Sequence, residues 1–124
     1  MGIKSQEEDL KFIESAIRIM NVKNTIVIKY NTDESLPPYP DIWIQKGVFS
    51  DTITITLECA KKNFHERRKR IVHELLHSLG EEHWDTPKEI TINGKNLQVL
   101  YSTYPEKDTY SALVYSYLLN RINR

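Results

Sequence analysis

Residues 73–83 read His-Glu-Leu-Leu-His-Ser-Leu-Gly-Glu-Glu-His, so three histidines lie within eleven residues. If residues 71–79 form a helix, His73 and His77 lie about 6 Å apart along one face, separated by one turn. Both imidazoles can then reach a single metal ion. The geometry of one helix therefore predicts two metal ligands.

The residues around these two histidines complete a catalytic arrangement. Glu74 is rotated by about 100° from His73, which places its carboxylate beside the ion, in the position of a general base. Gly80 can adopt a positive φ and end the helix, so that the chain reverses and brings His83 back as a third ligand. Three histidine nitrogens leave one tetrahedral position of zinc open, as in catalytic zinc sites. The motif predicts one zinc ion per chain.

Chance is a poor explanation of this pattern. From average residue usage, five specified residues in this register arise in so short a chain with a probability on the order of 10⁻⁵. Three of the four histidines lie within the motif, and the fourth, His65, receives no role. The motif is therefore interpreted as a metal site.

The spacing of His73, Glu74, His77, Gly80 and His83 matches the signature HExxHxxGxxH and resembles the metzincin clan of zinc-dependent metallopeptidases. The resemblance covers the motif and its approach. It implies that the three histidines bind zinc and that Glu74 activates water for attack on a peptide carbonyl. A peptide or protein substrate is accordingly expected.

One feature of the clan is missing from this chain. Metzincins carry a methionine in a turn beneath the metal, downstream of the third histidine, whereas the methionines here are Met1 and Met20. Leu100 or a nearby residue is a candidate for that space. The chain is also shorter than a typical metzincin catalytic domain, so the lower half of the usual substrate cleft is not expected in full.

Two alternatives remain. YbeY-type endoribonucleases of rRNA maturation have a similar three-histidine pattern, with glycine where this chain has Glu74, and residues 51–62 are similar to their approach of a strand leading into the ligand-bearing helix. Glu74 favours the peptidase, because amide hydrolysis needs a base for water and a proton for the leaving nitrogen. The third hypothesis is a non-catalytic module in which zinc only stabilises a small fold that binds a partner.

Composition agrees with one domain, residues 1–124. The chain has 124 residues and 40% hydrophobic content, enough for a single core. Seventeen basic and seventeen acidic residues give no net charge, which makes nucleic acid an unlikely partner. The basic run at residues 67–70 is expected to be a solvated helix face. Within it, Arg70 precedes Glu74 by one helical turn and can form an ion pair with it.

Cysteine content and hydropathy bear on the compartment. Cys59 is the single cysteine, so no internal disulfide forms; it is interpreted as a small buried residue rather than a metal ligand. Residues 4–9 are rich in charge where an export signal would be apolar, and no apolar run approaches the roughly 20 residues that span a bilayer. The prediction is a cytoplasmic protein without membrane contact, monomeric by default.

Periodicity predicts the flanking elements of an α+β domain. Ser5 and Glu8 form a capping box, and apolar residues at helical spacing predict a helix over residues 6–20. Asn63 with Glu66 can cap the motif helix. Asn93-Gly94 indicates a hairpin that flanks the cleft. The expected elements are the helix 6–20, strands 25–30, 42–45 and 52–57, a loop at Pro37, Pro38 and Pro40, the motif helix, a hairpin over 89–101, and a helix over 107–121 preceded by Pro105.

These elements predict a zincin-like domain. A mixed sheet of about three to five strands packs on the N-terminal helix and the metal-binding helix, with a C-terminal helix beside them. Residues 52–57 alternate threonine with apolar residues, which predicts one polar and one buried face. If this strand lies at the sheet edge beside the metal, its free amides can pair with an extended peptide substrate.

Several side chains outside the motif are candidates for supporting roles. Asp85 is interpreted as accepting a hydrogen bond from a ligating imidazole, with replacement of His83 as the less favoured role. Tyr101 and Tyr104 are candidates for oxyanion donors, although packing is the preferred role. Glu106 is an alternative third ligand, as in gluzincin metallopeptidases. Trp84 is interpreted equally as a wall of the site or as core filling.

Overall fold

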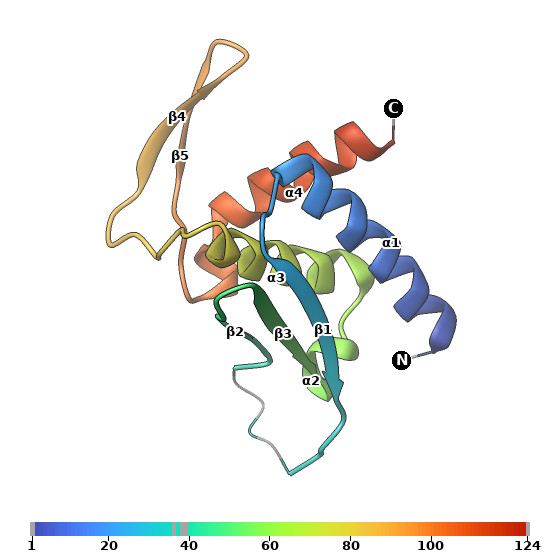
Figure 1. Ribbon diagram of the computed structural model, residues 1–124. Coiled ribbons are helices and arrows are strands. Elements are labelled where there is room, and N and C mark those ends of the chain that lie inside the picture. Colours follow the sequence, from blue (N-terminus) through green and yellow to red (C-terminus); the bar gives the residue numbers. More distant parts are fainter. Residues whose placement is uncertain (1, 36, 38–39, 124) are drawn as a thin grey trace.

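The computed structural model describes residues 2–35, 37 and 40–123 (Figure 1). The predicted α+β class is confirmed, with an N-terminal and a C-terminal helix around small sheets. Of the three loop prolines, Pro38 lies outside the described residues, and Pro37 and Pro40 lie between strands as expected. The elements are α1 (Ile3–Met20), β1 (Thr25–Asn31), β2 (Ile42–Gln45), β3 (Ser50–Thr56), α2 (Leu57–Ala60), α3 (Phe64–Ser78), β4 (Lys88–Ile92), β5 (Lys95–Val99), the 3₁₀ helix η1 (Pro105–Lys107) and α4 (Thr109–Ile122).

Helix α1 begins earlier than its sequence pattern indicates. Gly2 is the N-cap, in extended conformation, and its carbonyl accepts from the Gln6 amide at 3.1 Å. The predicted capping box at Ser5 and Glu8 is therefore wrong, because both residues lie inside the helix. Phe12, Ile13 and Ala16 on its apolar face are buried, and the helix ends at Met20, before Asn21, which has a φ of 60°.

The predicted strands all form, but one of them takes a different place. The described strands of the larger sheet have the order β1-β3-β2, with β1 parallel and β2 antiparallel to β3. The condition that β3 lies at the sheet edge is thus not met, since β3 pairs on both sides. Its predicted polar face is wrong, because Thr54 and Thr56 are buried and Thr56 Oγ1 donates to the Asp41 carbonyl at 2.6 Å. The edge strand beside the motif helix is β2.

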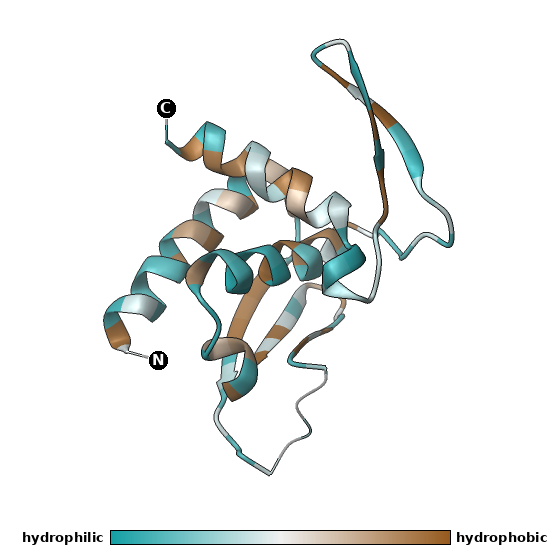
Figure 2. Cartoon of the chain, turned by 180° about the vertical axis from the view of Figure 1, so that it is seen from behind, coloured by the Kyte–Doolittle hydropathy of each residue, from teal (hydrophilic) through white to brown (hydrophobic). Residues whose placement is uncertain are grey.

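The core lies between this sheet and the helices. Ile53 and Ile55 of β3 are fully buried and belong to one cluster with Ile71 and Leu75 of α3. Figure 2 shows hydrophobic colours on the strands behind α3, while the outward side of that helix is largely hydrophilic. Burial of the α3 face that carries Ile71 and Leu75 fixes how the helix is rotated about its axis. That rotation determines the direction in which the histidines of α3 point.

A buried ion-pair group joins α1 to α3. Asp9 is fully buried and accepts from Arg67 Nε at 2.8 Å, Arg67 Nη2 at 3.2 Å and Arg68 Nε at 2.9 Å. Arg67 is itself buried, and the hydrogen bond that it donates to Asp9 is the main cause that raises its pKa. The prediction that residues 67–70 form a solvated face is therefore wrong. A carboxylate 58 residues away in sequence attracts the guanidinium groups inward.

Asp51, at the start of β3, anchors the end of the motif helix to the sheet. It is fully buried and accepts from Ser78 Oγ at 2.6 Å, the Gly47 amide at 3.0 Å and Asn24 Nδ2 at 3.2 Å. Burial acts to raise the pKa of the Asp51 carboxyl, but these hydrogen bonds and nearby Lys46 outweigh it and hold the pKa below its ordinary value. The folded chain therefore favours the carboxylate.

Replacing Asp51 by alanine is expected to lower the free energy of unfolding at neutral pH by about 1–3 kcal/mol, because three donors lose their acceptor. Since the folded-state pKa is depressed below an unfolded value of about 3.9, this stabilisation is present above that pH and disappears as pH falls through the folded-state pKa. Urea titrations from neutral to acidic pH measure the difference. A difference that grew on acidification would contradict the account. Glu14→Ala, an exposed change, is the control.

The smaller sheet is the predicted hairpin. Asn93 and Gly94 have φ values of 52° and 77°, and Ile92 pairs with Lys95, so a two-residue turn joins β4 to β5. The hairpin projects away from the helices and the larger sheet (Figure 1). Its exit at residue 100 leads the chain back toward the motif helix.

Candidate metal centre

Helix α3 positions two of the motif histidines as predicted. Asn63 caps its N-terminus by accepting from the Glu66 amide at 3.0 Å, and the helix ends at Ser78. Gly80 follows with a φ of 96°, where a side chain would be strained. The chain reverses at this residue and brings His83 back to the helix.

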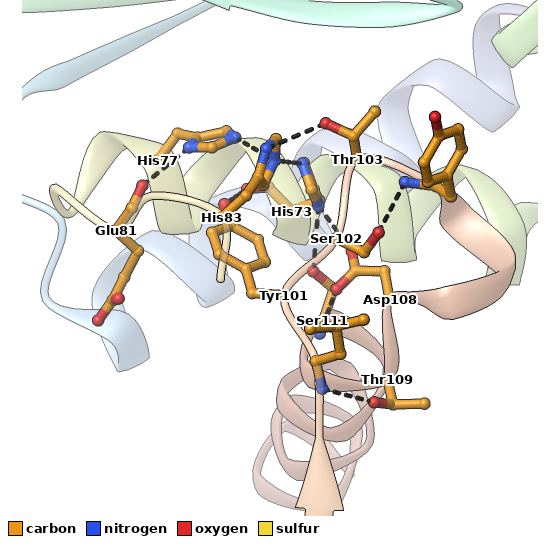
Figure 3. Close-up of polar contacts among 12 residues, drawn as sticks. His73, His77, Glu81, His83, Tyr101, Ser102, Thr103, Asp108, Thr109 and Ser111 are labelled. Atoms are coloured by element: carbon orange, nitrogen blue, oxygen red, sulfur yellow. Dashed lines mark hydrogen bonds and ion pairs between the residues drawn. The ribbon is translucent and has the colours of Figure 1, made fainter. Parts of the chain in front are cut away.

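The three motif histidines meet at their Nε2 atoms (Figure 3). The Nε2 of His83 lies 3.1 Å from that of His77 and 3.0 Å from that of His73. Two nitrogens bound to one tetrahedral zinc at 2.0–2.1 Å would lie about 3.3 Å apart, close to these separations. His73, His77 and His83 can therefore hold a metal ion, and no other group of this kind occurs in the part of the chain that the structure describes.

Each of these rings is anchored through its second nitrogen. Nδ1 of His73 lies 2.6 Å from Asp108 Oδ2, Nδ1 of His77 lies 2.8 Å from the Glu81 carbonyl oxygen, and Nδ1 of His83 lies 3.0 Å from Thr103 Oγ1. An acceptor at Nδ1 holds the proton there and leaves the Nε2 lone pair free for a metal. These contacts orient the three rings toward a common point.

Asp108 is a site residue that the sequence did not reveal. It is buried, it caps α4 by accepting from the Ser111 amide at 3.2 Å, and its other oxygen holds His73. The signal available in sequence was an aspartate at the start of the last helix, which predicts a cap but not contact with a histidine 35 residues earlier.

Burial favours the neutral form of two of the imidazoles, His77 and His83. Burial, followed by the neighbouring histidines, lowers the pKa of His83, and burial is also the main cause that lowers the pKa of His77. This environment therefore disfavours protonation of His77 and His83. Neutral imidazole is the form that binds metal.

Glu74 lies beside the histidines in a cavity of about 460 Å³. It is 6% exposed, and burial, with the nearby carboxylates of Asp41 and Asp108, raises its pKa to about 8. The ion pair that Arg70 could form with Glu74 is absent, because Arg70 Nη1 binds Asp41 instead. Glu74 is thus free of that cation, and a metal ion nearby would supply the positive charge that favours its ionised form.

The cavity is bounded by three parts of the chain. One wall is the edge strand β2, another is α3 with the histidines, and the third is the segment 102–112, which includes η1 and the start of α4. No described residue of the β4–β5 hairpin lines it, so the prediction that the hairpin flanks the cleft is wrong. The hairpin extends outward and leaves the cavity mouth to the other segments.

The remaining candidates lie elsewhere. Asp85 and Glu106 are exposed and are not part of the histidine group, and the partners of the imidazoles named above take the role expected of Asp85. Tyr104 is 55% exposed. Trp84 packs on Tyr101 and Tyr110, with ring centroids 6.2 and 4.7 Å away, so its place is in the aromatic packing beneath the site.

Tyr101 and Cys59 are both fully buried. Burial, with the charges of Glu74 and Asp108 next, raises the pKa of Tyr101 well above its ordinary value; its hydroxyl donates to the His73 carbonyl at 2.6 Å. That donor is not available to an oxyanion, which confirms the preferred packing role. Burial raises the pKa of the Cys59 thiol to about 12, and Cys59 is not part of the histidine group.

Comparison with known proteins gives no match to a protein family, to a curated protein or to a solved structure. Among the described residues, no helix has the length and apolar character that a membrane crossing requires.

Proposed function

We propose that this chain is a zinc-dependent peptidase whose ion is held by His73, His77 and His83. The observation that carries the proposal is the convergence of three Nε2 atoms, with neighbours 3.0 and 3.1 Å apart, beside the carboxyl of Glu74 in an open cavity. The resemblance of the motif to the metzincin clan supports it. One zinc per chain is the expected complement, since three imidazoles suit zinc and leave a position open.

Bound zinc would supply Lewis acidity, polarising the scissile carbonyl and lowering the pKa of water. The other chemistry belongs to Glu74. Its carboxylate takes a proton from the attacking water and then delivers it to the leaving amine nitrogen. Because Glu74 is 6% exposed, few solvent molecules compete with the attacking water for hydrogen bonds to its carboxylate oxygens. The arrangement thus supplies the base and the acid in one side chain.

The cavity offers a surface for an extended peptide. Strand β2 is at the edge of its sheet, and its residues 42–44 form one wall of the cavity. A backbone with unpaired N–H and C=O groups can bind a substrate strand by adding it to the sheet. We therefore assign to β2 the substrate-pairing role that the sequence pattern suggested for β3.

The endoribonuclease is the second candidate, and the ion pairs count against it. Arg67 and Arg68 are bound to Asp9, and Arg70 is bound to Asp41. These guanidinium groups are already engaged by carboxylates of the chain, and the chain has no net charge, which disfavours their use as phosphate contacts. A non-catalytic zinc module is the third candidate, but a closed structural site would have four protein ligands.

The proposal is tested by loading the purified chain with zinc and incubating it with an unfolded protein such as reduced casein and, separately, with structured RNA. The expected result is new peptide amino termini, detected by mass spectrometry, that disappear when a chelator removes zinc. Cleaved RNA with intact casein would favour the nuclease. No cleavage of either substrate, with zinc required for folding, would favour the binding module.

A further inference from the structure

One buried residue contacts all three histidine rings. Tyr101 follows β5 and is fully buried, and its ring centroid lies 4.7 Å from that of His73 and 5.1 Å from those of His77 and His83. In the described part of the chain, no other aromatic ring outside the triad contacts each of its members. Figure 3 shows Tyr101 beside the histidines, on the irregular segment that leads to Thr103.

The polar atoms of Tyr101 connect the two segments that supply these histidines. Its hydroxyl donates to the His73 carbonyl oxygen on α3 at 2.6 Å. Its own carbonyl oxygen accepts from the Trp84 amide at 3.0 Å, directly after His83. One residue therefore links the helix that carries two histidines to the loop that carries the third.

The loop histidine needs this connection most. His73 and His77 are fixed relative to each other by α3, whereas His83 lies past Gly80, outside regular structure. Its ring is held by Thr103, which comes only two residues after Tyr101 in the same segment. Tyr101 thus packs its ring against the three histidine rings. Its position also determines where Thr103, which orients His83, can lie.

We propose that Tyr101 is a positioning residue that pre-organises the three-histidine centre for metal. Ordering a loop and three rings costs conformational free energy, and a residue that orders them in advance removes this cost from metal binding. This inference rests on the proposed metal site. It concerns metal affinity and geometry, which are measured without a catalytic assay.

The test uses two variants. Tyr101→Phe keeps the ring and removes the hydroxyl, and Tyr101→Leu also removes the aromatic ring that contacts the histidines. The zinc dissociation constant is measured by competition with a chromophoric chelator, and the coordination geometry by the visible spectrum of the cobalt(II) form. We expect zinc binding to weaken several-fold in the Phe variant, and about 10–100-fold in the Leu variant, as for residues that orient metal ligands. The cobalt(II) bands should shift or weaken in both.

Tyr110→Phe is the matched control. Its ring packs on Trp84 and Tyr101 but contacts none of the three histidine rings, so the same loss of a hydroxyl should leave zinc affinity unchanged. Zinc affinity within twofold of wild type and an unchanged cobalt(II) spectrum in Tyr101→Phe would overturn the positioning role, even if Tyr101→Leu failed to fold. A wild-type chain that bound no metal would instead overturn the proposed function, on which this inference rests.

Discussion

Replacing Glu74 by glutamine is expected to reduce peptide hydrolysis by about 10²–10⁴-fold while one metal ion remains bound. Glutamine has nearly the same shape and cannot accept the proton of the attacking water. The histidines that hold the ion keep their Nδ1 partners, Asp108, the Glu81 carbonyl and Thr103, none of which involves the Glu74 side chain. Initial rates on a fluorogenic peptide and zinc content, measured on the same preparations, test both statements.

Glu89→Gln serves as the control, because Glu89 is exposed on the projecting hairpin and lies outside the cavity. Its rate should equal that of the wild type. Undiminished hydrolysis in Glu74→Gln, with zinc bound, would remove Glu74 from the mechanism and leave the identity of the base open to other residues of the cavity. Parallel loss of rate and zinc would give Glu74 a structural role instead.

The largest stability effect is expected at Asp9. Replacing this carboxylate by alanine leaves Arg67, 7% exposed, as a buried cation without its main partner, and breaks the link between α1 and α3. Removing one member of a buried ion pair costs about 3–5 kcal/mol, so the free energy of unfolding should fall by that amount. Urea denaturation followed by circular dichroism measures it.

Glu8→Ala is the matched control for this prediction, since Glu8 is the neighbouring carboxylate on α1 and is exposed. Its effect should be within about 0.5 kcal/mol of zero. A loss below about 1 kcal/mol for Asp9→Ala would mean that water or another anion replaces the carboxylate, and that the Asp9 group contributes little to the packing of the two helices.

Local patterns in the sequence predicted most helices and strands, and they predicted that the three motif histidines come together. The spacing of His73 and His77 on one helix, with Gly80 as the turn before His83, is a statement about neighbours in sequence, and helix geometry converts it directly into space. The Asn93-Gly94 turn was predicted for the same reason, since both residues tolerate a positive φ.

What the sequence could not predict depends on partners far away in the chain. Arg70 has a local candidate partner one turn away, yet it binds Asp41, 29 residues earlier, because the packing of α3 on β2 brings them together. Asp108 reaches His73 only once α4 has packed on α3. Strand order is equally non-local, so residues 52–57 could be predicted as a strand but not as the central one.

Elemental analysis of the purified chain, repeated on His83→Ala, tests the metal site most directly. We expect one zinc per wild-type chain and its loss, or a greatly weakened affinity, in the variant, since His83 supplies the third converging nitrogen. Undiminished zinc in His83→Ala would contradict the three-histidine centre. A wild-type chain that stayed without zinc even after zinc was added would contradict the metal site altogether.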